Sequence, residues 1–177
     1  MFNGRAVGCF VAACAAVALA GPVLQGRQAG DRPGEKTVIL GTWSWDIESN
    51  GLEPNNGTAD LFWEQVTKTE QNLVPQNGAG LAVLKKQAFD KVTRGDLAGL
   101  KYSTKKIPGT DLTPGTVLAL RTAEGNLAKL KVVGRRALHD FTFPEARHLK
   151  ENFRAFVLQQ PDQKDYHLEV EWVLYQK

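Results

Sequence analysis

Short apolar runs separated by turn signals dominate the pattern of hydrophobic and polar positions along the chain. Glycine follows Asn or Pro at four of these signals, which are Asn50-Gly51, Asn56-Gly57, Asn77-Gly78 and Pro114-Gly115. Regular turns between runs of strand length are typical of antiparallel sandwiches and barrels. The pattern predicts a mainly β, single-domain antiparallel sandwich or small barrel with short helical turns. The runs expected as strands span residues 38–48, 59–66, 80–84, 116–122, 126–133, 153–159 and 166–175.

Alternation within two of these runs predicts which side chains enter the core. Side chains point to opposite faces in turn along a strand. In the run 38–48, one face carries Ile39, Trp43, Trp45 and Ile47, so both tryptophans are expected in the core. In the last run the even positions are apolar, and we expect burial of Leu168, Val170, Trp172 and Leu174. Short helical turns are expected around Phe89, Val92, Leu97 and Leu100.

The segment GTVLALRTAEGNLAKLKV, residues 115–132, predicts a β-hairpin. Pairing Thr122 with Asn126 places Leu120 opposite Ala128 and Leu118 opposite Leu130, so apolar residues share one face. The loop then has three residues, Ala123-Glu124-Gly125, and a type I turn closed by a left-handed glycine suits it. A phosphate-binding glycine loop is the alternative, but neither a helix start nor a Lys-Ser/Thr pair follows.

The first twenty residues differ from the rest of the chain. Arg5 precedes an apolar stretch that ends in Ala-Leu-Ala at residue 20, and this arrangement predicts a signal peptide cleaved before Gly21. The alternative is a lipoprotein signal, because Val11-Ala12-Ala13-Cys14 resembles a lipobox with Cys14 as the lipidated residue. We expect an exported protein, periplasmic or extracellular, that does not span the membrane. Residues 21–36 are expected to form a flexible linker to a domain over residues 37–177.

Composition narrows the chemistry of the exported domain. The chain has 177 residues, a formal net charge of +3 and two cysteines, Cys9 and Cys14, both within the leader. Thiol catalysis and cysteine-based metal sites are therefore excluded for the mature domain. The slight positive excess gives no support for nucleic-acid binding, which needs a clustered basic surface. No cofactor is expected, and no catalytic residue is assigned.

Candidate binding residues come from two places in the sequence. Trp63 lies between Asp60 and Glu64, and a tryptophan face with carboxylates beside it suits a sugar. Carboxylate pairs also perform glycoside hydrolysis, but the spacings in this region are common by chance. The loop 46–60 is rich in Asp, Glu and Asn, so calcium binding and a solvated acidic loop both remain open. The second place is the hairpin strand, where Lys129 and Lys131 are candidates for binding an anionic polymer.

The two lysines have an alternative structural role. If the hairpin strand and the last strand are neighbours, Lys129 and Lys131 face Glu169 and Glu171 across the sheet. We expect an exposed charge ladder that fixes the register, with Arg121 as a further member. Residues 135–165 are expected to be an insertion outside the core, in which the PDQKD turn closes a hairpin.

Several short motifs resemble a β-rich domain of uncharacterised exported bacterial proteins. The motifs are ADLFWEQ from residue 59, LVPQNGA from residue 73, GTVLALRTAEGNLAKLKV from residue 115 and WVLY from residue 172. The resemblance implies an exported β-rich module and no particular reaction. Two functions remain open. One is a non-catalytic module of the cell envelope that binds a protein or a polysaccharide. The other is a small secreted hydrolase that uses carboxylates.

Overall fold

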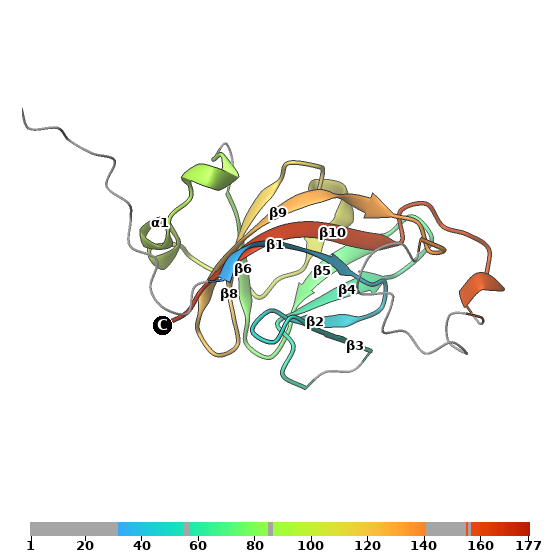
Figure 1. Cartoon of the computed structure of the whole chain (residues 1–177), viewed down its shortest axis with the longest axis horizontal. Coiled ribbons are helices and arrows are strands. Elements are labelled where there is room, and N and C mark those ends of the chain that lie inside the picture. Colours follow the sequence, from blue (N-terminus) through green and yellow to red (C-terminus); the bar gives the residue numbers. More distant parts are fainter. Residues whose placement is uncertain (1–31, 55–56, 85–86, 141–154, 156) are drawn as a thin grey trace, which may run out of the picture.

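Two antiparallel sheets pack face to face in the structure, a computed structural model that describes residues 32–54, 57–84, 87–140, 155 and 157–177 (Figure 1). Sheet A has the strand order β1-β10-β9-β8-β6, and sheet B has the order β3-β2-β4-β5-β7. The predicted mainly β antiparallel fold is confirmed. Because the strands form two separate sheets, the domain is a sandwich and not a closed barrel.

Ten strands and three short helical elements with defined bounds make up most of the described fold, and Ala155 and residues 157–158 are also helical. Sheet A contains β1 (Arg32–Ile39), β6 (Gly80–Val83), β8 (Val117–Arg121), β9 (Leu127–Arg136) and β10 (His167–Tyr175). Sheet B contains β2 (Ser44–Asp46), β3 (Gly51–Glu53), β4 (Leu61–Gln65), β5 (Gln71–Pro75) and β7 (Ile107–Pro108). The helical elements are η1 (Phe89–Lys91), α1 (Arg94–Ala98) and η2 (Gly109–Asp111). The short helical turns predicted around Phe89 and Leu97 are confirmed, whereas β3, β5 and β7 were not predicted.

Alternating side chains of both sheets fill the main core between them. Trp45 of β2 meets Trp172 of β10 edge to face, with the ring centroids 5.6 Å apart. The even-numbered residues of β10 are fully buried, as predicted, and Trp45 is also fully buried. The indole N–H of Trp172 donates to the Thr37 hydroxyl at 3.0 Å, so this buried polar group has a partner. Trp43 is only half-buried and lies outside the core cluster, so its predicted core position is wrong.

The run 38–48 is not one strand. β1 ends at Ile39 in sheet A, and the chain then crosses to sheet B, where β2 begins at Ser44. Thr42 has φ 64°, a left-handed conformation that interrupts a strand. Gly41 sits directly under the ring of Tyr166, where an added Cβ would lie 2.2 Å from a ring carbon. Close packing at the crossing therefore requires glycine and ends the first strand.

The predicted hairpin between β8 and β9 is confirmed in detail. Leu118 pairs with Leu130 and Leu120 with Ala128. The Thr122 N–H donates to the Asn126 carbonyl at 3.0 Å, which closes the three-residue loop. Gly125 has φ 83°, the left-handed conformation that the loop requires.

Residues 87–102 cover the outer face of sheet A with a second apolar cluster. Phe89, Val92 and Leu97 pack there against Val117 and Ala119 of β8. The outward face of this sheet is therefore not uniformly solvated. Its apolar members, Leu127, Val173 and Tyr175 among them, lie under the helical turns.

The predicted charge ladder is only partly present. β9 and β10 are neighbours, and Lys131 lies opposite Glu171 with its ammonium 2.5 Å from the carboxylate. Lys129, however, lies opposite Val173, and Glu169 lies opposite Gly134. A register shift between Glu169 and Val170 moves the remaining partners, so Glu169 pairs with Arg136 instead, at 2.8 Å. The predicted Lys129–Glu169 pair is therefore wrong.

The ends of the predicted domain also differ from expectation. Residues 32–36, expected as the end of a linker, form the start of β1. Ala155 and residues 157–158 are helical, so the strand predicted over residues 153–159, and the hairpin that it would form, are wrong. The leader, residues 1–20, and much of the insertion expected over residues 135–165 lie outside the described residues.

Candidate functional site

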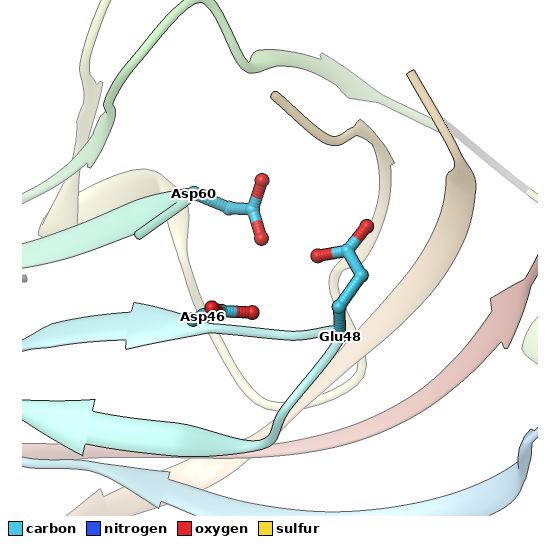
Figure 2. A group of neighbouring side chains, drawn as sticks. All are labelled: Asp46, Glu48 and Asp60. Carbon is cyan, nitrogen blue, oxygen red and sulfur yellow. The ribbon is translucent and has the colours of Figure 1, made fainter. Parts of the chain in front are cut away.

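Three carboxylates converge beside the hairpin loop, at one end of sheet B. Asp46 ends β2, Glu48 follows in the next turn, and Asp60 immediately precedes β4. Their carboxylate groups point toward one another in Figure 2, and the nearest oxygens of the three lie within 4.8 Å of each other. The antiparallel pairing of β2 with β4 brings the two distant parts of the sequence together.

Asp60 is the fully buried member of this carboxylate cluster, with no exposed surface. Its Oδ2 accepts a hydrogen bond from the Ile47 N–H at 3.1 Å, and its Oδ1 accepts one from the Ala123 N–H at 2.8 Å. Ala123 belongs to the hairpin loop of sheet A. The side chain therefore joins the turn after β2 to the hairpin of the opposite sheet, which is a structural use of a carboxylate.

Glu48 and Asp46 complete the cluster with hydrogen bonds of their own. Glu48 Oε1 accepts from the Asn126 amide at 2.9 Å, whereas its buried Oε2 has no hydrogen-bond partner among the described residues. Asp46 accepts from the Ser49 N–H and from the Thr58 hydroxyl, both at 3.1 Å. Four of the six carboxylate oxygens thus accept from the backbone or a hydroxyl, and a fifth from an amide.

Burial raises the pKa of Asp60 from 3.8 to about 7. The hydrogen bonds from Ala123 and Ile47 lower that pKa, and the charge of Glu48 raises it further. Near neutral pH a large share of the molecules therefore carries a proton on Asp60. Such a proton provides a donor to Glu48, which removes the repulsion between the two carboxylates.

The carboxylate oxygens of Asp46, Glu48 and Asp60 are better suited to hold a proton than a calcium ion. Calcium takes six to eight oxygen ligands, and here Glu48 Oε2 is the one carboxylate oxygen without a hydrogen-bond partner in the described part of the cluster. The backbone N–H groups of Ile47 and Ala123 already donate to Asp60, so each oxygen of this carboxylate accepts a hydrogen bond. Asp60 is therefore an enclosed member of an otherwise mostly half-buried or exposed loop, and calcium binding by the loop 46–60 stays a prediction.

The structure does not gather the predicted binding residues into one site. Trp63 has no exposed surface, and its indole N–H donates to the Tyr166 carbonyl at 2.9 Å. The guanidinium of Arg135 lies over the Trp63 ring, 4.4 Å from the ring centroid. The Trp63 ring is therefore occupied by protein contacts and is not open to a sugar. Glu64 is partly exposed, and hydrogen bonds from Asn72 and then Lys106 lower its pKa.

Lys129 and Lys131 lie on β9 of sheet A, whereas Trp63 and Glu64 belong to β4 of sheet B and Asp60 directly precedes that strand. Lys129 is 7% exposed, and its ammonium donates to the Phe89 and Val92 carbonyls at 2.8 and 2.9 Å. Burial lowers its pKa. Lys131 is paired with Glu171. Lys129 is therefore a structural contact that holds the helical turns on the sheet, and polymer binding by Lys131 stays a prediction.

His167 is a second buried titratable group, beside the other end of β4. Its Nδ1 accepts from the Gly41 N–H at 2.9 Å, and its Nε2 lies 3.4 Å from the Leu138 carbonyl. The ring is thus neutral with the hydrogen on Nε2. Burial lowers its pKa from 6.5 to about 4. The hydrogen bond to the Leu138 carbonyl and the charges of Asp140 and Asp162 act in the opposite direction and raise that pKa. Protonation of Nδ1 would remove the bond from Gly41, which closes the crossing between the sheets.

Sequence reasoning placed Asp46, Glu48 and Asp60 in one acidic loop but missed their convergence. It also missed Asn126 and the hairpin N–H of Ala123, which lie more than sixty residues away. These hydrogen bonds follow from the packing of one sheet on the other, and no local sequence pattern predicts them.

The fold and this cluster define the protein as an antiparallel β-sandwich in which three carboxylates, one of them fully buried, converge beside the hairpin loop. No protein-family model, no curated protein and no solved structure matches the chain significantly. The resemblance to exported bacterial domains therefore rests on its motifs alone. Among the described residues, no helix is long and apolar enough to cross a membrane.

Proposed function

We propose that the protein is an exported, non-catalytic module of the cell envelope that binds a protein or a polysaccharide. The leader over residues 1–20 supports export, because its charged start, apolar middle and small-residue end are those of a signal peptide. A disulfide-free sandwich held by its core is also suited to a binding module, whose surface is free to vary.

The use of the carboxylates carries the non-catalytic part of the proposal. A general acid or base must come within hydrogen-bond reach of the substrate. Asp60 is fully buried, and both of its oxygens accept backbone N–H groups. A carboxylate enclosed in this way stabilises the fold and does not reach a substrate.

The carboxylate-dependent hydrolase has one observation in its favour. The pKa of Asp60, raised to about 7, is typical of a catalytic acid beside a second carboxylate. Buried structural groups show the same shift, however, so this observation alone does not identify an active site.

One experiment separates the two functions. The secreted protein, purified from its host, is applied to an array of glycans and envelope proteins, and is incubated in parallel with a panel of glycosidase and esterase substrates. The proposal expects retention on the array without turnover, both for the natural protein and for Asp60→Asn. Turnover that disappears in Asp60→Asn would establish the hydrolase instead. A product that remains in the cytoplasm would contradict export.

A further inference from the structure

Charge is strongly segregated along this chain. Residues 37–67 contain five acidic residues and no Lys or Arg. Residues 87–106 contain five basic and two acidic residues, although the whole chain has a net charge of only +3. The acidic stretch supplies β2, β3 and β4 of sheet B. The basic stretch runs over the outer face and the β6 edge of sheet A, so the two charges lie on different parts of the sandwich (Figure 1).

Three exposed cations belong to the segments that pair with β6: Lys101 and Lys105 come from the basic stretch, and Arg121 comes from β8. Arg121 of β8 lies opposite Gly80 of β6, and the neighbouring Leu81 forms a bridge with Ser103. Lys101 and Lys105 each lie two residues from Ser103 in the sequence, so their backbone stays close to this edge. All three cationic residues are exposed. We call Lys101, Lys105 and Arg121, together with Tyr102, the basic surface.

The chain holds the basic surface in a defined shape. The guanidinium of Arg121 lies over the Tyr102 ring, 5.3 Å from its centroid. The Tyr102 hydroxyl donates to the Leu97 carbonyl at 2.9 Å, and Ser103 exchanges two backbone hydrogen bonds with Leu81. At Gly80 an added Cβ would lie 2.8 Å from that of Tyr102, so glycine permits this close approach. A ligand therefore meets cations on an ordered backbone and loses less entropy on binding.

The cations of this surface are available, whereas other charges nearby are already used. None of the three lies within ion-pair distance of a carboxylate in the described part of the chain. Lys106, next in sequence, pairs with Glu64 at 3.1 Å and is therefore not included. The two acidic residues of the stretch are also engaged. Asp96 caps α1 through Thr93, and the charge of Asp90 acts on buried Lys129.

The spacing of the cations favours an extended anion. Neighbouring strands lie roughly 4.7–4.9 Å apart, so two strand steps separate Arg121 from the Ser103 segment by about 10 Å. Cations so separated cannot converge on one small anion. A polymer with repeated charges engages all of them at once, and each further contact is then intramolecular. The planar guanidinium on its aromatic support binds a carboxylate or a phosphate through two parallel N–H groups. For a polysaccharide ligand, the corresponding groups are the carboxylates of acidic sugars.

We propose that the basic surface is the ligand-binding face of the module, and that it binds an anionic polysaccharide with carboxylates along its chain. This inference rests on the proposed function, and it specifies the class of ligand and the surface of the module that binds it. Binding is electrostatic at exposed positions, so added salt weakens it.

Polygalacturonate oligosaccharides of defined length are the probe, and binding to the natural secreted protein is measured by calorimetry at low and physiological salt. The test variant is Lys101→Gln/Lys105→Gln/Arg121→Gln. The matched control is Lys36→Gln/Lys68→Gln/Lys164→Gln, which removes the same charge from exposed positions elsewhere. We expect at least a tenfold loss of affinity in the test variant, less than a twofold loss in the control, and no binding of neutral dextran. Thermal unfolding of both variants shows that the fold is intact.

Several results would overturn this inference. Equal losses in both variants would show a general charge effect, and an unchanged test variant would place the ligand elsewhere. Tighter binding of duplex DNA or of anionic phospholipid vesicles, lost in the same test variant, would assign the surface to a different polymer. If the test variant still binds another envelope component, the proposed function holds but the basic surface is not the binding face. If the natural protein binds no envelope component, both the proposed function and this inference are wrong.

Discussion

The carboxylate cluster and the basic surface both gather charge, yet they differ in what their charges touch. In the carboxylate cluster, Asp60 is enclosed and accepts two backbone N–H groups from different parts of the sandwich. In the basic surface, the cations of Lys101, Lys105 and Arg121 face solvent without a carboxylate partner among the described residues. Convergence of like charges is therefore a poor guide to a binding site. A cluster of like charges is available to a ligand only where its hydrogen-bonding groups lack partners within the protein.

The largest expected effect comes from removing the enclosed carboxylate. Asp60→Ala leaves two buried N–H groups without an acceptor, at a cost of about 1–3 kcal/mol each, partly offset by the lost repulsion with Glu48. We expect a net loss of about 2–4 kcal/mol in the free energy of unfolding, measured by urea denaturation at pH 7. Glu64→Ala, which removes a partly exposed carboxylate from the same region, is the control and should cost less than about 1 kcal/mol. Similar losses in the two variants would refute the structural role of Asp60.

Asp60 and His167 give stability opposite dependences on pH. The pKa of His167 is lowered, so its contribution is present above pH 6.5 and is lost as the pH falls toward 4. The loss amounts to about 3 kcal/mol. His167→Gln stays neutral, so the variant should be less sensitive to acid over this range in urea denaturation at several pH values. An unchanged acid dependence would show that His167 is not held neutral.

The pKa of Asp60 is raised, so its effect has the opposite sign. Its stabilising contribution is present below pH 3.8 and is lost as the pH rises through about 7. Asp60→Asn does not titrate, and its stability relative to the natural protein should therefore rise between pH 4 and pH 7. A constant difference across this range would contradict the proton shared with Glu48.

A smaller effect is expected from the ion pairs on the outer face of sheet A. Lys131 and Glu171 lie opposite each other, so a double-mutant cycle to Ala should give a coupling of about 0.2–1 kcal/mol. The Lys129–Glu169 cycle is the control. Lys129 lies opposite Val173 and bonds carbonyls of η1 and the next turn, so its coupling to Glu169 should be close to zero. Equal couplings would show that the register shift is absent.

A small effect on stability is expected for the basic surface. Exposed substitutions change stability by no more than about 0.5 kcal/mol each, and loss of the Arg121 contact with the Tyr102 ring adds about 0.5–1 kcal/mol. The triple Gln variant at residues 101, 105 and 121 should therefore unfold close to the natural protein by urea denaturation. A loss as large as that of Asp60→Ala would mean that these cations hold the fold and are not free for a ligand.

Local patterns predicted the parts of the fold that depend on neighbours in sequence. The hairpin register followed from the alternation of Leu118 and Leu120 with their partners and from one glycine, Gly125. The buried face of β10 followed from strict alternation. Each of these features is decided within about twenty residues, where side-chain period and turn chemistry act together.

The errors arose where distant segments meet. The crossing at Gly41 depends on the ring of Tyr166, and the burial of Lys129 depends on helical turns forty residues away. A signal for the second case was present, because Val117 and Ala119 make both faces of β8 apolar, which indicates a strand covered on both sides. The enclosure of Asp60 by Ala123 had no such signal in the sequence.

We conclude that Asp60 is an enclosed part of the fold and holds a proton near neutral pH. The most direct test is the ¹³C chemical shift of the Asp60 carboxyl followed through a pH titration, with and without calcium. We predict a midpoint near pH 7, the same in both conditions. A midpoint below pH 5, or one that calcium moves strongly downward, would show an open acidic site and contradict the enclosure of Asp60.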